Sequence, residues 1–104
     1  MAEEKIKAWL NKYRLELNVG NKFEKAFLKL LEWDRKNIDA RFSSYPAGMA
    51  YVASLMSGEE ITQEQIAKTS SCSRTSLRKR YRQIKARNND KIIDYVDPFL
   101  VTHM

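Results

Sequence analysis

Cysteine, glycine and proline are scarce in this sequence, which has one, three and two of them among its 104 residues. The single cysteine, Cys72, excludes an internal disulfide and a multi-cysteine metal site, so we expect no metal and a reducing, intracellular environment. Few glycines and prolines disfavour a fold built from hairpins, because tight turns depend on them. The sequence therefore predicts a helical protein.

Long hydrophobic runs and leader-like segments are also missing. The longest apolar run, from Met49 to Met56, contains Ser54 and is far shorter than the roughly 20 residues that span a membrane. The N-terminus carries Glu3 and Glu4 and no apolar stretch, so we expect neither a signal peptide nor a transit peptide. With 43% hydrophobic and 31% charged residues, the chain has the composition of one water-soluble domain.

Residues suited to catalysis are sparse. The one histidine, His103, is next to the last residue, and no glycine-rich phosphate loop or cluster of acids occurs. Glu59 and Glu60 are adjacent, so they would diverge on a helix, and we expect them to decorate a loop. The sequence predicts no enzyme and no cofactor.

Hydrophobic spacing predicts a run of helices. A first helix is expected over about residues 3 to 17 and a second over about 21 to 37, where Asp34 shares one face with apolar side chains. Pro46 suits the first turn of a third helix, which Gly58 is placed to end. That helix is apolar nearly all round, so we expect it in the middle of a bundle. Its small residues, which would let neighbouring helices approach closely, are Ala47, Gly48, Ala50 and Ala53.

The segment from residue 62 to 87 has the pattern of a helix-turn-helix. Thr62 and Gln65 form a capping box, which predicts that a short helix begins at Gln63. A turn of serines and Cys72 follows, and Ser73 caps a longer helix. The inward stripe of the longer helix is expected to be Leu77, Tyr81 and Ile84.

Positive charge is concentrated in one part of the chain. Residues 68 to 91 hold nine basic side chains and one acid, whereas the remainder has a net charge of −2. Such clustering is the footprint of a polyanionic partner, usually nucleic acid, because neutralised phosphates release counterions. A solvated face that only keeps the protein soluble is the alternative, but such faces mix signs and the segment from Arg74 to Arg87 has no acid. Together with the helix-turn-helix pattern, this charge predicts binding to nucleic acid, which for a helix-turn-helix is double-stranded DNA.

One face of the longer helix is suited to reading bases. Successive side chains of a helix are rotated by about 100°. If Leu77, which is expected to face the core, is placed at 0°, the side chains at about 100° to 200° lie on the opposite face. The four residues on this face are predicted to contact base edges: Thr75, Arg78, Lys79 and Arg82. The residues that flank them are predicted to contact phosphates: Ser73, Arg74, Arg80, Lys85 and Arg87.

A set of short motifs occurs in order between residues 45 and 84: a proline-alanine-glycine helix start, A-S-L, G-E, T-Q-x-x-I-A and R-x-R-Y. The residues that carry them are Pro46, Ala47, Gly48, Ala53, Ser54, Leu55, Gly58, Glu59, Thr62, Gln63, Ile66, Ala67, Arg78, Arg80 and Tyr81. With this spacing, the segment resembles the carboxy-terminal cyclin-type repeat of archaeal transcription factor B, the counterpart of eukaryotic general transcription factor IIB.

The resemblance implies an all-α fold, a five-helix cyclin-like bundle over residues 1–90 whose last two helices form the helix-turn-helix, followed by a tail over 91–104. It implies recognition of the promoter element upstream of the TATA box, beside TATA-binding protein. The location would be the archaeal cytoplasm or a eukaryotic nucleus, and we expect a monomer. In the family the base contacts come from the start of the last helix, at the positions of Thr75 and Arg78 here.

Three departures from the family pattern limit these implications. Ser71 stands where the family often has a glycine in the turn, and a positive φ there would cost on the order of 1 kcal/mol. Arg74 stands where an acid is common, which should strengthen the attraction to phosphates and alter the sequence preference. The zinc ribbon, the linker and the first cyclin repeat are absent from these residues, so RNA polymerase would be reached only through missing domains.

Two other functions fit parts of the sequence. Cyclin folds also act as adaptors between proteins, and the apolar segment from residue 92 to 101 is a candidate docking segment, although such tails more often fold back onto their own bundle. A small stand-alone regulator with a helix-turn-helix usually binds as a dimer. That function needs a self-complementary apolar patch, and the sequence identifies none.

Overall fold

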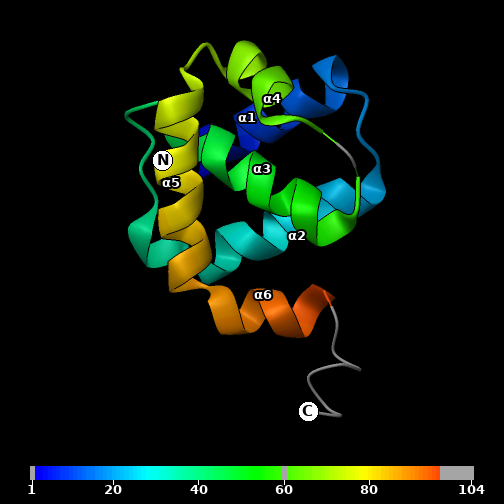
Figure 1. Cartoon of the computed structure of the whole chain (residues 1–104), viewed down its shortest axis with the longest axis vertical. Coiled ribbons are helices and arrows are strands. Elements are labelled where there is room, and N and C mark those ends of the chain that lie inside the picture. The colour runs from blue at the N-terminus through cyan, green and yellow to red at the C-terminus, as the bar shows by residue number, and fades with distance from the viewer. Residues whose placement is uncertain (1, 60, 97–104) are drawn as a thin grey trace.

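The computed structural model describes residues 2–59 and 61–96, and this part of the chain is helical, without a strand. Its helices, in order (Figure 1), are α1 Ala2–Glu16, α2 Asn21–Trp33, the short 3-10 helix η1 Arg35–Asn37, α3 Ser44–Ser57, α4 Gln63–Ser70, α5 Arg74–Arg87 and α6 Asn89–Val96. The expected all-α class is confirmed. Within the described ranges, none of these helices is long and apolar enough to cross a membrane.

The described residues form one α-helix more than the five expected. α6 occupies the first part of the segment expected to be a tail, and Ile92 of α6 is buried against the core. The ring of Tyr95 lies edge-on to that of Trp33, with 5.9 Å between ring centroids. The helix is only eight residues long and follows a polar run, so its periodicity is too short to stand out in the sequence. The rest of the expected docking segment, residues 97 to 101, lies outside the described residues.

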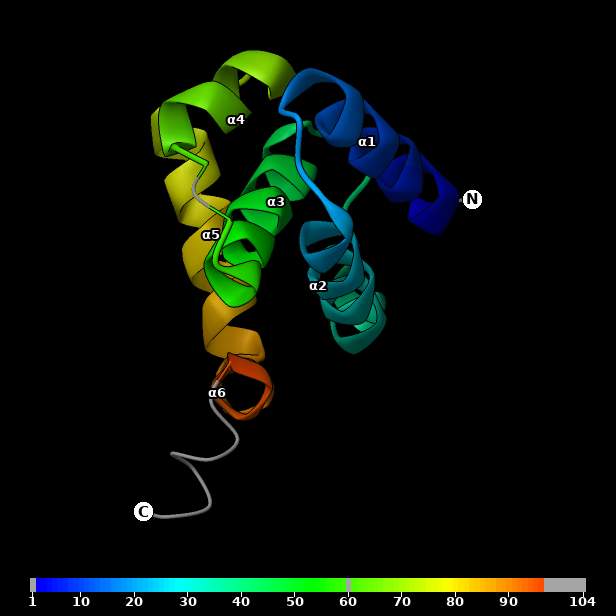
Figure 2. The same cartoon turned by 90° about the vertical axis from the view of Figure 1, so that its right-hand side faces the viewer.

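α3 is the central helix, as its apolar composition predicts. It contacts each of the other α-helices that the structure describes, most extensively α5 and α2. Figure 2 shows α3 between these two neighbours, with α4 above α5. Most side chains of α3 are buried, including Met49 and Val52. The predicted helix-turn-helix segment therefore packs on one side of a helix that is itself fixed by the rest of the bundle.

α3 and α5 cross with their backbones in direct contact at Gly48. A Cβ atom at this position would lie 2.7 Å from the backbone nitrogen of Tyr81 and 2.8 Å from the Cβ of Arg80. Both distances are well below the roughly 3.5–4.0 Å at which carbon atoms pack without strain. Beside the crossing, the rings of Tyr51 and Tyr81 meet edge to face, with 5.0 Å between their centroids. The expectation that small residues of α3 admit a close neighbour is confirmed here.

The C-terminal end of α3 holds the beginning of α2. Gly58 ends α3 in the left-handed conformation, with φ of 75°. The Glu59 carboxylate then accepts hydrogen bonds from the backbone N–H groups of Gly20 (2.9 Å) and Phe23 (2.7 Å). An anion at a helix N-terminus meets unpaired N–H groups and the positive end of the helix dipole. Glu59 was expected only to decorate a loop; it caps α2.

We predict that Gly48→Ala destabilises the protein by about 1–3 kcal/mol, because the added methyl group overpacks the crossing. In an unobstructed helix the same change stabilises by roughly 0.5–1 kcal/mol, so the sign of the effect reports the close approach. Urea denaturation followed by circular dichroism would measure the free energy of unfolding. Asn11→Ala, at an exposed position of α1, is the control and should be neutral or slightly stabilising. A Gly48→Ala variant at least as stable as the wild type would contradict the tight crossing.

Candidate nucleic-acid interface

Both helices of the predicted helix-turn-helix begin at the caps that the sequence indicates. The Thr62 hydroxyl accepts a hydrogen bond from the Gln65 backbone N–H at 3.1 Å, and the Gln65 side-chain oxygen accepts one from the Thr62 N–H at 2.9 Å. The Ser73 hydroxyl accepts from the Ser76 N–H at 3.1 Å. Each cap satisfies N–H groups that have no partner within the helix. The predicted starts of α4 and α5 are confirmed.

The turn between α4 and α5 places Ser71 in the left-handed region, with φ of 57° and ψ of 42°. This is the position where a glycine was expected to be more favourable, and the cost for serine is on the order of 1 kcal/mol. Ala67 and Lys68 accept hydrogen bonds from the N–H groups of Cys72 and Ser71, which fixes the turn. Cys72 packs against the hydrophobic core beside this turn, and burial raises the pKa of its half-buried thiol.

α4 is attached to the other side of the bundle through a buried hydrogen bond. The hydroxyl groups of Tyr13 and Ser70 lie 2.6 Å apart, and both residues are fully buried. Burial raises the pKa of Tyr13 well above its ordinary value, and the hydrogen bond to Ser70 only partly offsets this. The phenol therefore stays neutral and the bond ties the last turn of α4 to α1.

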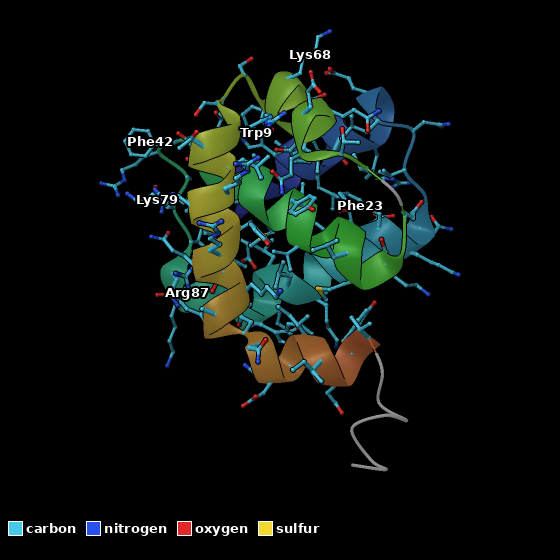
Figure 3. The ribbon with its side chains drawn as sticks, in the orientation of Figure 1. Trp9, Phe23, Phe42, Lys68, Lys79 and Arg87 are labelled. Atoms are coloured by element: carbon cyan, nitrogen blue, oxygen red, sulfur yellow. The ribbon has the colours of Figure 1, made fainter. Side chains whose placement is uncertain are left out.

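α5 turns one face to the core and the opposite face to solvent. Leu77 and Ile84 are fully buried, whereas Tyr81 is half-buried. The structure brings together the four predicted base-contacting residues, which are all exposed and line one open hollow of about 420 Å³: Thr75, Arg78, Lys79 and Arg82. Figure 3 shows Lys79 on the outer side of α5, away from α3. The helical period thus places these side chains on a single surface, which we call the outer face of α5.

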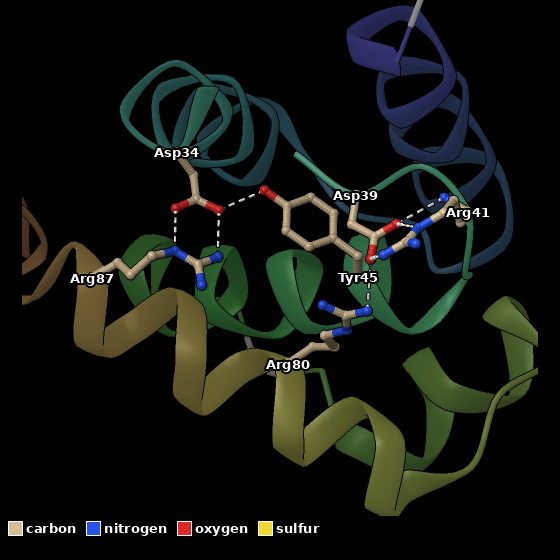
Figure 4. A network of polar contacts seen from close by, with 6 residues as sticks. All are labelled: Asp34, Asp39, Arg41, Tyr45, Arg80 and Arg87. Carbon is tan, nitrogen blue, oxygen red and sulfur yellow. Dashed lines mark hydrogen bonds and ion pairs between the residues drawn. The ribbon is translucent and has the colours of Figure 1, made fainter. Parts of the chain in front are cut away.

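Two of the cations predicted to contact phosphates, Arg80 and Arg87, form ion pairs within the protein instead of pointing freely into solvent. Arg87 donates from Nε and Nη2 to the two carboxylate oxygens of Asp34, at 2.9 and 2.8 Å. Arg80 donates from Nη2 to Asp39 at 2.7 Å. Figure 4 shows both arginines reaching from α5 to aspartates that follow α2. Sequence reasoning missed these pairs; the only signal for one of them was Asp34 on the apolar face of α2.

Asp34 is completely buried and has a full set of donors. Besides Arg87, the Tyr45 hydroxyl donates to it at 2.5 Å and the Asn88 side-chain amide at 3.1 Å. Burial alone would raise the pKa of Asp34, but the hydrogen bonds from Arg87, Tyr45 and Asn88 outweigh it and hold the pKa below its ordinary value. Burial is the largest cause that raises the pKa of Tyr45, and the hydrogen bond to the Asp34 carboxylate raises it further. Asp34 is thus a buried anion that anchors the C-terminal end of α5.

The remaining cations of α5 are available to an external partner. Within residues 2–59 and 61–96, none of the following five forms an ion pair: Arg74, Arg78, Lys79, Arg82 and Lys85. Arg78 makes one internal hydrogen bond, from Nε to the side-chain oxygen of Gln63 at 2.9 Å. The Ser73 hydroxyl is engaged in capping α5 and in a 3.0 Å contact with the Ser76 hydroxyl. The outer face therefore keeps a strong positive charge after the internal ion pairs are formed.

Comparison with known proteins finds an informative similarity. The chain is similar to transcription initiation factor IIB 1 of Thermococcus kodakarensis, with 28% identity over 88 residues. The match covers 81% of this chain but 29% of that relative, so the chain spans under a third of that protein's length. No protein-family model matches the chain, and no solved structure matches it significantly. The similarity supports a distant relationship to a factor of this type.

We predict that Asp34→Asn lowers the free energy of unfolding by about 2–3 kcal/mol at pH 7, because it leaves the Arg87 guanidinium without its anion. The pKa of Asp34 is lowered on folding from an ordinary value of 3.8. Its contribution is therefore complete above that value and is lost as the pH falls below it. The stability difference between the wild type and the variant should shrink at pH 3.

Urea denaturation at pH 7, 5 and 3 would measure this difference. Asp94→Asn, at an exposed position of α6, is the matched control and should stay within about 0.5 kcal/mol of the wild type at each pH. A constant difference between wild type and Asp34→Asn across this range would show that ionised Asp34 is not what stabilises α5.

Proposed function

We propose that this chain is the DNA-binding module of a transcription initiation factor. In this proposal α5 lies in the major groove and recognises a promoter element upstream of the TATA box, beside TATA-binding protein. The similarity to transcription initiation factor IIB 1 supports a role in initiation. The observation that carries DNA recognition is the outer face of α5, which has exposed cations and no acid.

Base recognition is assigned to the first two turns of α5. The N-terminal part of the second helix is the part of a helix-turn-helix that reaches base edges. Arg78 is suited to guanine, whose O6 and N7 accept two hydrogen bonds from one guanidinium, and the Thr75 methyl group is suited to contact with a thymine methyl group. Lys79 and Arg82 lie on the same hollow and extend the contact along the groove. The proposed function is binding alone, without catalysis.

Phosphate contact is assigned first to Arg74 and Lys85, which flank the outer face without an ion pair among the described residues. Arg80 and Arg87 were also predicted to contact phosphates. Their side chains are 25% and 33% exposed and already paired with Asp39 and Asp34. A phosphate contact from either would have to share the guanidinium with its aspartate, so we expect these two to contribute less to binding.

The bundle suits the cyclin-like arrangement that the sequence resemblance implies. In our proposal α1 to α5 are its five helices, with α4 and α5 as the helix-turn-helix and α6 as an added element. Support comes from the central position of α3 and from the two capped helices that pack on it. This arrangement presents α5 at the edge of the bundle, where a DNA duplex has access to its outer face.

A second candidate function is that of an adaptor for another protein. α3 and α6, with Lys85 of α5, form a hollow of about 310 Å³. Its other lining residues are all apolar: Val52, Leu55, Met56, Ile92, Ile93 and Val96. Leu55, Ile93 and Val96 are each about half exposed, at 50%, 44% and 52%. Exposed apolar patches often mark protein-binding sites, and this patch favours the adaptor function over a purely structural role for α6.

The proposed function predicts preferential binding to a promoter duplex with its natural flank. A labelled TATA duplex would be titrated with its upstream flank intact or scrambled, with and without TATA-binding protein, over a series of salt concentrations. We expect tighter binding to the intact flank and a further gain with TATA-binding protein. Salt-sensitive binding that ignores the flank would reduce the function to non-specific DNA binding. No binding to either duplex would favour the adaptor function.

Two substitutions should separate base contact from phosphate contact. Arg78→Ala is expected to weaken binding to the preferred duplex by about 1–3 kcal/mol and to relax the base preference at one position. Lys85→Ala should weaken binding to all sequences alike and lower the slope of log affinity against log salt by about one. Competition titrations at several salt concentrations measure both quantities. Equal losses on preferred and random DNA for both variants would refute the assigned roles.

A further inference from the structure

Gln63 and Arg78 join the first helix of the helix-turn-helix to the outer face of the second. Gln63 is the first residue of α4, and its backbone position is fixed by the capping box around Thr62. The Nε–H group of Arg78 donates to the Gln63 side-chain oxygen at 2.9 Å, although 15 positions separate the two residues. Gln63 is half-buried and Arg78 is exposed. The hydrogen bond therefore connects a residue whose backbone is fixed by the capping box to a cation on the outer face of α5.

The hydrogen bond uses the inner donor of the guanidinium, and the outer donors have no partner among the described residues. An arginine has five N–H donors in one plane, and Nε contributes one of them. Holding Nε fixes the plane of the group and leaves the terminal nitrogens as the donors for an external acceptor. Both Gln63 and Arg78 also line a groove of about 750 Å³ beside the start of α5. This geometry would orient the Arg78 guanidinium before DNA binds.

We propose that Gln63 is a positioning residue, which sets the base preference of the protein by orienting the Arg78 guanidinium. This inference rests on the proposed function, since it concerns how α5 distinguishes DNA sequences. A side chain that must be ordered on binding costs about 0.5–1.5 kcal/mol, and an oriented one avoids part of this cost. The competing explanation is a purely structural tie between α4 and α5, which would affect all DNA sequences equally.

The test compares three substitutions on two DNA probes. The probes are the duplex that the wild-type protein selects from a randomised pool, and a scrambled duplex of the same composition. Gln63→Met removes the acceptor at similar length and should lower the ratio of the two affinities about two- to tenfold, the range expected for one side chain left unordered. Gln63→Glu keeps an acceptor at the same reach. It should weaken binding to both probes through its charge while restoring the ratio to within about twofold of wild type.

Gln83→Met is the matched control, because it removes the amide of an exposed glutamine on α5 that makes no hydrogen bond within the described residues. It should leave the ratio of affinities unchanged. Thermal unfolding of each variant checks that the fold is retained. A Gln63→Met variant that loses affinity equally on both probes, or keeps the wild-type ratio, overturns the inference and leaves only a structural tie.

A double-mutant cycle tests whether Gln63 acts through Arg78. In an Arg78→Ala background, Gln63→Met should have no further effect on the ratio of affinities, because the side chain that it orients is gone. Independent, additive losses would overturn the proposed mechanism. The single variants and the double variant are measured on the same two probes.

A measurement without DNA separates failure of this inference from failure of the proposed function. The NMR signal of the Arg78 Nε–H group should be protected from exchange in the free wild-type protein and lose this protection in Gln63→Met. If the wild type selects no sequence from the pool, the proposed function fails and the inference with it, whatever the NMR signal shows. If the wild type selects a sequence but the Nε–H signal is unprotected, the inference alone is overturned.

Discussion

The crossing of α3 and α5 at Gly48 is the constraint on which the rest of the structure depends. Because the backbone of α5 touches α3 at Tyr81 and Arg80, α5 is fixed in both distance and rotation. Rotating it by one residue, about 100°, would carry a charged side chain into the core and expose an apolar one. Because Gly48 has only a hydrogen atom where alanine has a methyl group, α5 can pack closely on α3 in this orientation. This orientation determines which side chains of α5 face outward.

The fixed rotation of α5 divides its seven basic residues into two groups. Arg80 and Arg87 are two helical turns apart on one flank and meet Asp39 and Asp34. The others, on the outer face and its margins, have no ion pair among the described residues. The Asp34 carboxylate is fully buried. A buried ion pair adds little net stability but is costly to break, so the main effect of the Asp34–Arg87 pair is to favour one packing position of α5 over the others. The same aspartates that orient α5 thus leave its outer face positive.

Features determined by neighbouring residues could be predicted from the sequence, whereas partners distant along the chain could not. The caps at Thr62 and Ser73 depend on residues a few positions apart, so local rules give them. The shared surface of the four predicted base-contacting residues follows from the helical period. The partners of Arg87 and Glu59, by contrast, lie 53 and 39 positions away, and no local pattern states which polar groups will meet. The sequence shows that these charges exist but leaves open which of them are used internally.

Several basic residues of α5 destabilise the helix in which they lie. Arg74 lies in the first turn, where the helix dipole disfavours a cation, and the pairs Arg74–Arg78 and Arg78–Arg82 place like charges four residues apart, at about 0.2–0.5 kcal/mol each. The helix is therefore held by packing on α3 and by the two aspartates. A polyanion along the outer face would relieve the remaining repulsion, which is the role that the proposed function gives to DNA. Neutral residues on this face would stabilise the free protein and weaken that binding, so the retained repulsion is itself an argument for a polyanionic partner.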